Sequence, residues 1–220
     1  MLPIKEFMML MAITLIQLQF LMSLIFNHAE KITLTTLRKL KAQKQKIVML
    51  TAYNYPFAQI LEESKVTAIL VGDSLGMTNW GYPSTLQVTM DDMCQATAAV
   101  AKAAPSKFII TDMPFLSYQT SVQTAVLNAG KLLQAGAQAV KLEGARHLEA
   151  VSAIINAGIP VLGHLGFVPQ SLHQIGGYKV QGNTLEEIKT LSQAACELEK
   201  RGVFGIVFEL TKQEAIKKLV

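Results

Sequence analysis

Five acidic or titratable residues stand where short apolar stretches of the sequence end, and between these stretches lie segments of helical character. These residues are Asp73, Asp112, Glu143, His164 and Glu209. Two or three carboxylates that come together suit Mg²⁺, which prefers oxygen ligands and leaves positions for water and substrate. A cation chelated by a 2-oxo acid withdraws electrons from the carbonyl and stabilises an enolate. A glutamate with a raised pKa or a lysine with a lowered pKa would then remove the neighbouring proton.

Two further polar residues accompany this set: Ser74 follows Asp73, and Lys141 lies inside the fourth apolar stretch. A single carboxylate at the end of a strand is often no more than a cap for the next helix. Five consecutive strand ends that all carry such a group are not explained by capping. The pattern therefore predicts a site, although it does not identify the reaction.

The apolar stretches predict six buried strands, because β-branched and apolar residues run through them without polar interruption. The predicted strands are 47–51, 68–72, 108–112, 139–143, 161–164 and 204–209. Continuous apolar strands are typical of a parallel sheet covered by helices. Thr89 with Asp92, and Thr184 with Glu187, predict capping boxes at two of the intervening helices.

Strict alternation of strands and helices leaves two architectures, an open doubly wound α/β sheet and a (β/α)₈ TIM-type barrel. No P-loop is present, and the glycines of GGYKVQG (176–182) do not open a helix directly after a strand. The barrel is therefore favoured, with only about six βα units in the chain. In such a barrel the carboxyl ends of all strands open onto one face, where active sites lie.

The charge and the cysteines argue against other classes of protein. The net charge is +4, but six basic residues and no acidic residue fall between positions 31 and 46, and the rest of the chain has 14 basic against 16 acidic residues. A local basic run predicts a solvated helix face rather than a nucleic-acid interface. Cys94 and Cys196 have no CxxC or Cys/His spacing, so we expect buried, reduced thiols and neither a zinc site nor a disulfide.

The first 30 residues form a hydrophobic N-terminal extension, in which segment 8–26 has no charged residue and is long enough to cross a bilayer. One interpretation is a membrane anchor, with the basic run at 31–46 as its positive-inside flank. The other is a non-native extension, for instance from an upstream start codon. We favour the second interpretation, because everything after residue 31 is typical of the beginning of a soluble enzyme.

Several motifs in one order and spacing resemble those of the ketopantoate hydroxymethyltransferase family. They are LTAYNYPFAQ (50–59), VGDSLGM (71–77), TDMPF (111–115), VKLEG (140–144), GHLGFVPQS (163–171) and GGYKVQG (176–182). The resemblance runs from about residue 32 to about residue 209. It implies a barrel of the phosphoenolpyruvate/pyruvate superfamily and transfer of a hydroxymethyl group from 5,10-methylenetetrahydrofolate to 3-methyl-2-oxobutanoate. The product is 2-dehydropantoate, an intermediate of pantothenate biosynthesis.

The resemblance also implies roles for the residues named above. Asp73, Asp112 and Glu143 would hold Mg²⁺, and Glu209 would accept the proton. The 2-oxo acid would contact Asp73, Ser74, Asp112, Lys141 and His164. The family's members are cytoplasmic homo-oligomers, usually decamers, that act on small molecules rather than on nucleic acids or membranes.

The chain departs from this family at both ends. Residues 1–30 have no family counterpart, and the family continues beyond strand six with two more βα units. We therefore expect an incomplete catalytic barrel over residues 31–220. The alternatives are an inactive barrel fragment and a membrane-tethered form.

Overall fold

The computed structural model describes residues 30–217, and those from residue 32 onward form one compact unit. The predicted anchor or extension at 8–26 lies outside the described residues. Between residues 30 and 217, no helix is long and apolar enough to cross a membrane.

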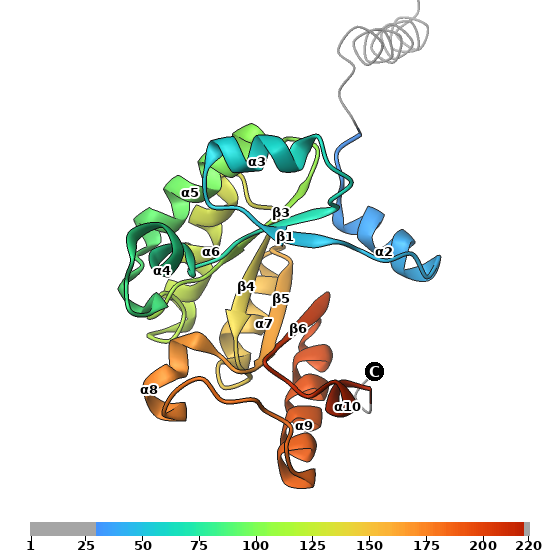
Figure 1. Ribbon diagram of the computed structural model, residues 1–220, viewed down its shortest axis with the longest axis vertical. Coiled ribbons are helices and arrows are strands. Elements are labelled where there is room, and N and C mark those ends of the chain that lie inside the picture. Colours follow the sequence, from blue (N-terminus) through green and yellow to red (C-terminus); the bar gives the residue numbers. More distant parts are fainter. Residues whose placement is uncertain (1–29, 218–220) are drawn as a thin grey trace, which may run out of the picture. The chain divides into compact units, whose positions relative to one another are not determined.

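The compact unit is built on a sheet of six parallel strands that follow one another in chain order (Figure 1). The strands are β1 (Met49–Thr51), β2 (Ala68–Val71), β3 (Phe108–Asp112), β4 (Ala139–Glu143), β5 (Val161–Gly166) and β6 (Gly205–Glu209). All six predicted strands are confirmed. The first begins two residues later than expected, and the fifth continues two residues further, to Gly166.

The helices are α2 (Leu34–Ala42), α3 (Tyr55–Glu62), α4 (Leu75–Trp80), α5 (Met90–Ala103), α6 (Val122–Gln134), α7 (Leu148–Asn156), α8 (Leu172–Ile175), α9 (Leu185–Arg201) and α10 (Gln213–Ile216), with 3₁₀ turns η1 (Thr85–Gln87) and η2 (Pro169–Ser171). Helices α3 to α9 lie between successive strands in the chain, the longer of them along the outer face of the sheet, while α2 precedes β1 and α10 follows β6 (Figure 1). The predicted capping box of Thr89 and Asp92 is present at the start of α5. At α9 the box is incomplete, because the Glu187 carboxylate binds the backbone N–H of Asn183 instead of that of Thr184.

The four inner strands, β2 to β5, are buried on both faces, as the apolar runs predicted, whereas β1 and β6 are partly exposed. Successive side chains of a strand point to opposite faces of a sheet. Ile69 and Ile109 thus belong to the larger core between the sheet and the outer helices, whereas Ala68 and Phe108 face inward. Leu37 of α2 joins this inner core, so α2 covers the amino-terminal end of the inner face.

The sheet is open among the described residues, because β1 and β6 each pair with one neighbour only. Along β1, Val48 and Leu50 are 46% and 48% exposed. The six-unit barrel that the sequence predicted is therefore present as a curled sheet with two free edges. The expectation of two buried thiols is wrong, since Cys94 is half-buried and Cys196 is exposed.

Candidate active site

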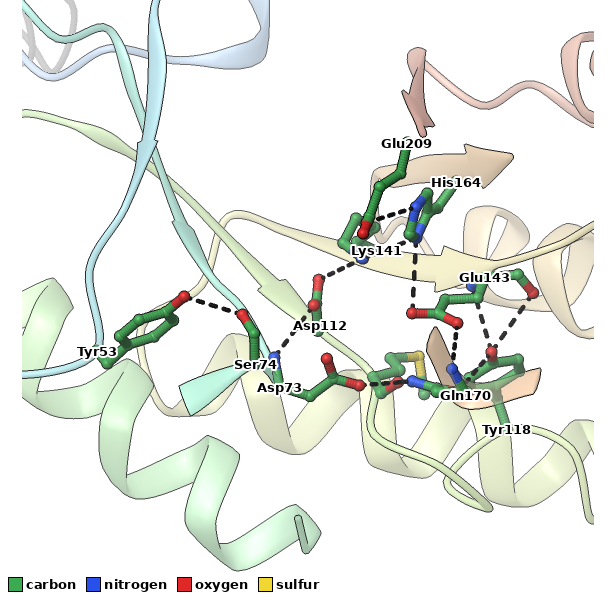
Figure 2. A network of polar contacts seen from close by, with 11 residues as sticks. Tyr53, Asp73, Ser74, Asp112, Tyr118, Lys141, Glu143, His164, Gln170 and Glu209 are labelled. Carbon is green, nitrogen blue, oxygen red and sulfur yellow. Dashed lines mark hydrogen bonds and ion pairs between the residues drawn. The ribbon is translucent and has the colours of Figure 1, made fainter. Parts of the chain in front are cut away.

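The predicted site residues meet at the carboxyl ends of the strands, and strand pairing explains why. Asp112 is opposite Lys141 in the pairing of β3 with β4, and Glu143 is opposite His164 in the pairing of β4 with β5. Each of these residues is two or four positions beyond an inward-facing apolar residue of its own strand. Because side chains alternate between the two faces along a strand, these side chains also point to the inner face. Figure 2 shows that Asp73, Ser74 and Glu209 complete the same network.

Asp73 contacts the end of β3, and Ser74 contacts Tyr53, which follows β1. The backbone N–H of Asp73 donates to Asp112 Oδ2 at 3.1 Å, and Ser74 Oγ lies 2.9 Å from the hydroxyl of Tyr53. Glycine at position 72 leaves room for the serine side chain, since a Cβ there would lie only 3.0 Å from Ser74 Oγ. The end of β2 is therefore held within hydrogen-bond distance of the second aspartate.

Lys141 is the cation at the centre of the site. Its Nζ lies 3.0 Å from Asp112 Oδ1 and 3.2 Å from His164 Nδ1, and its side chain is 5% exposed. Burial lowers the pKa of Lys141, but the carboxylates of Asp112, Glu143 and Asp73 outweigh burial, and the pKa is raised. The ammonium therefore stays charged, and the possibility of a lysine base with a lowered pKa is wrong.

The carboxylates around Lys141 need more positive charge than one ammonium provides. Burial and, next, the charge of Asp112 raise the pKa of Asp73 to about 8, although Lys141 and a hydrogen bond from Gln170 act in the opposite direction. Burial also raises the pKa of Asp112 against the effect of Lys141. In this state the site favours carboxyl protonation, and an added cation would reverse that preference.

His164 bridges two acidic residues. Its Nδ1 lies 3.6 Å from Glu143 Oε1, and its Nε2 lies 3.2 Å from Glu209 Oε2. The nearer contact of Nδ1 is with the Lys141 ammonium, which can only donate, so a neutral His164 would accept at Nδ1 and carry its proton on Nε2. Burial and Lys141 lower the pKa of His164, but the contacts with Glu143 and Glu209 outweigh them and raise it.

Glu209 lies at the free edge of the sheet, and its side chain is 42% exposed. The hydrogen bond with His164 lowers the pKa of Glu209, and this effect exceeds the opposing effect of burial. The expectation of a base with a raised pKa is therefore wrong for Glu209 in this state. A carboxylate that is ionised at neutral pH remains able to accept a proton.

Gln170 and Tyr118 belong to the same network, and the sequence reasoning assigned no role to either. Gln170 is buried in η2 and binds Asp73 and Glu143, while the Tyr118 hydroxyl donates to Gln170 Oε1 at 2.9 Å. The PQS motif contains Gln170, but an uncharged side chain in a turn does not by itself indicate a role in the site. Tyr118 lies outside the motifs and the strand ends, so no feature of the sequence pointed to it.

A cavity of about 610 Å³ opens beside Glu143 and Gln170. Aromatic and cationic side chains line part of it, among them Phe115, Tyr118 and Arg146. Small-molecule sites typically have volumes of about 300–1,000 Å³. The cavity is therefore large enough for a second substrate next to the carboxylates.

The donor set fits a magnesium ion. Within residues 30–217, the buried Glu143 Oε1 has no hydrogen-bond donor, and Asp112 Oδ1 has no well-directed one although Lys141 is close. No three His, Cys, Asp or Glu side chains of this part of the chain converge as a ready-made metal cage. Mg²⁺ does not require such a cage, because it is commonly bound through one or two carboxylates together with water and substrate.

Comparison with known proteins places the chain in a family. The family model described as ketopantoate hydroxymethyltransferase matches residues 31–220. The enzyme named 3-methyl-2-oxobutanoate hydroxymethyltransferase from Ignicoccus hospitalis is 52% identical over 191 residues, which cover 86% of this chain and 73% of that protein. The enzymes of the same name from a Thermotoga species and from Saccharolobus solfataricus are 51% and 48% identical, and the chain covers 68% and 72% of their lengths.

Solved structures with low sequence identity share the fold. Phosphonopyruvate hydrolase in complex with oxalate and Mg²⁺ matches with a TM-score of 0.64 at 14% identity, over 84% of this chain and 66% of that one. 2,3-Dimethylmalate lyase, a member of the PEP mutase/isocitrate lyase superfamily, matches with a TM-score of 0.63 at 15% identity, over 84% and 67%. These likenesses confirm the predicted barrel class. With the family match over residues 31–220 and identities near 50%, the chain belongs to the ketopantoate hydroxymethyltransferase family.

Proposed function

We propose that this chain transfers a hydroxymethyl group from 5,10-methylenetetrahydrofolate to 3-methyl-2-oxobutanoate and so forms 2-dehydropantoate. The observation that carries the proposal is the buried cluster of Asp73, Asp112, Lys141, Glu143 and His164 at one end of the sheet, with Glu209 beside it. Family membership supports the reaction, and the cluster supports the chemistry that the reaction needs.

Asp73 and Asp112 would hold Mg²⁺, and Glu143 would complete the site, directly or through water. The ion would supply Lewis-acid polarisation of the 2-oxo group when bound. A solved structure of the same fold class contains oxalate, a small dicarboxylate, together with Mg²⁺. This precedent supports a small oxygen-rich acid as the substrate class, but the donor set of this chain carries the argument.

Ser74, Lys141 and His164 would bind and orient the 2-oxo acid together with Asp73 and Asp112. The Lys141 ammonium is fixed between Asp112 and His164, so it is positioned to attract an oxygen on which negative charge develops. Water is largely excluded there, which strengthens this attraction.

Glu209 would accept the proton from the third carbon of the 2-oxo acid. The carbon–hydrogen bond breaks, the proton moves to the carboxylate, and the electron pair is delocalised towards the 2-oxo oxygen. The carbon would then form a bond to the one-carbon unit of the folate. Both bonds from that unit to the folate nitrogens would break, water would supply the hydroxyl group, and the two nitrogens would take up the proton from the third carbon and one proton of the water. The cavity beside Glu143 would hold this second substrate, with Arg146 available for its carboxylates.

Deuterium exchange tests the proposal without folate. The full chain, Mg²⁺ and 3-methyl-2-oxobutanoate are incubated in D₂O, and deuterium at the third carbon is followed by NMR. We expect exchange that requires Mg²⁺ and that Asp112→Ala abolishes. Exchange no faster than in the Asp112→Ala control would refute the proposal.

The free edges of β1 and β6 favour a second candidate, a barrel chain without turnover. In that case the wild type would bind substrate weakly and exchange no deuterium, and it would lack a cooperative thermal transition. We further propose that the chain acts as a cytoplasmic homo-oligomer. Sedimentation of the full chain, with and without the substrates, tests the assembly.

A further inference from the structure

Gln170 lies where the ends of three neighbouring strands converge (Figure 2). Its backbone N–H donates to Glu143 Oε2, at the end of β4, at 2.9 Å. Its side-chain amide group donates to Asp73 Oδ2 and to the backbone oxygen of Met113, both at 2.9 Å. Asp73 follows β2, and Met113 follows β3. One uncharged residue of the turn after β5 therefore ties together the ends of β2, β3 and β4.

The orientation of the Gln170 amide is determined by its surroundings. The Met113 carbonyl can only accept, so the amide NH₂ must face it. On the other side, Oε1 accepts from the hydroxyl of Tyr118 at 2.9 Å and from Nε2 of Gln119 at 3.0 Å. A flipped amide would place oxygen against oxygen at Met113 and NH₂ against NH₂ at Gln119. Because the residue is 7% exposed and both donors and both acceptor positions are occupied, it is held in one arrangement.

These contacts restrict the two carboxylates that flank the proposed metal position. Asp73 and Glu143 each have one oxygen bound by Gln170, so the direction of the other oxygen is limited. We propose that Gln170 is a positioning residue, which sets Asp73 and Glu143 for the divalent cation and thereby for the 2-oxo acid. This inference rests on the proposed function. Outer partners of metal ligands typically change metal affinity by about 10- to 100-fold when they are removed.

Mn²⁺ is the probe for the test, because the free ion gives a quantifiable electron paramagnetic resonance signal. The full chain is titrated as wild type and as Gln170→Met, which keeps the length of the side chain and the backbone N–H but removes the amide. We expect the Kd for Mn²⁺ to rise about 10- to 100-fold. Gln174→Met is the matched control, since Gln174 is exposed in the same segment and binds Arg146 instead of the carboxylates. Its Kd should equal that of the wild type.

A merely structural role would lower the thermal midpoint of Gln170→Met without changing the Kd of the folded protein. An unchanged Kd, measured well below the thermal midpoint, would overturn the inference. Should Gln170→Met lack a cooperative thermal transition, Tyr118→Phe decides the matter. It removes one of the two donors to Gln170 Oε1, and the loss of one hydrogen bond corresponds to a Kd about 2- to 10-fold higher; an unchanged Kd would again overturn the inference.

The same titration separates this inference from the proposed function. Saturable Mn²⁺ binding by the wild type that Asp112→Ala removes supports the metal site. With that result, a normal Kd in Gln170→Met refutes the positioning role alone. A wild type that binds no Mn²⁺ would refute both.

Discussion

Replacement of Lys141 by methionine tests whether one buried ammonium holds the acidic cluster together. The side chains of Lys141 and Asp112 are only 5% and 6% exposed, and their charged atoms lie 3.0 Å apart. Removal of one partner from a buried ion pair costs about 3–5 kcal/mol, because the other charge is left without compensation. We therefore expect Lys141→Met to lower the free energy of unfolding by about this amount.

For a domain of this size, 1 kcal/mol shifts the thermal midpoint by about 2–4 °C. The expected fall is therefore about 6–20 °C, measured by circular dichroism on the full chain without divalent cations. Lys107→Met is the matched control. Lys107 is also buried, but its ammonium donates to the Ser64 carbonyl at 2.8 Å instead of to a carboxylate. We expect a clearly smaller fall for this variant.

The thermal midpoint of Lys141→Met with Mg²⁺ provides a second test. A cation in the site replaces part of the missing positive charge, and at about 100 times its Kd it stabilises the folded state by about 2.7 kcal/mol. Mg²⁺ should therefore raise the midpoint of Lys141→Met. A cation-free midpoint of Lys141→Met equal to that of the wild type would refute the reasoning, because the carboxylates would then not depend on the ammonium.

Three further predictions concern the base and the scaffold. Gly166 has a φ of 90°, and a Cβ there would meet the backbone carbonyl of Glu209. Gly166→Ala should therefore reduce both the stability of the fold and the rate of deuterium exchange. Gly158 has a φ of 86° and open space around it, so Gly158→Ala should reduce only the stability, by about 1–2 kcal/mol. Equal exchange rates in the two variants would contradict this. His164 lowers the pKa of Glu209, so His164→Gln should raise that pKa. Because the base must be ionised, the acid limb of the pH profile of the exchange rate should then move to higher pH. A pH profile without this displacement would argue against Glu209 as the base. Thr89→Ala removes the side-chain cap of α5 and should lower the free energy of unfolding by about 0.5–2 kcal/mol, measured by urea unfolding. An unchanged urea midpoint would contradict this prediction.

The strands and most of the site were predictable because they depend on local pattern and on strand pairing. Continuous apolar runs marked all six strands, and parallel pairing of their ends brings Asp112, Lys141, Glu143 and His164 to one face. A period of two along each strand was enough to direct these side chains inward.

What the sequence did not reveal depends on contacts between distant segments. Gln170 reaches Asp73 across 97 positions of the chain, and its turn geometry follows from tertiary packing. The lowered pKa of Glu209 arises from its contact with His164 and from the charge of Lys141, and neither can be read from the strand on which Glu209 lies. The half-formed cap at Thr184 depends on the backbone position of Asn183.

The outer edge of β6 has a chemical consequence for the proton acceptor. Within residues 30–217 no strand covers this edge, and the Glu209 side chain is partly exposed, while its contact with His164 lowers its pKa. A polypeptide that pairs with β6 and also covers the Glu209 side chain would remove water from this carboxylate, and loss of hydration raises the pKa of a carboxylate and strengthens it as a base. The extent to which Glu209 is covered would therefore act against its contact with His164, and the two effects together would set how readily the carboxylate accepts a proton.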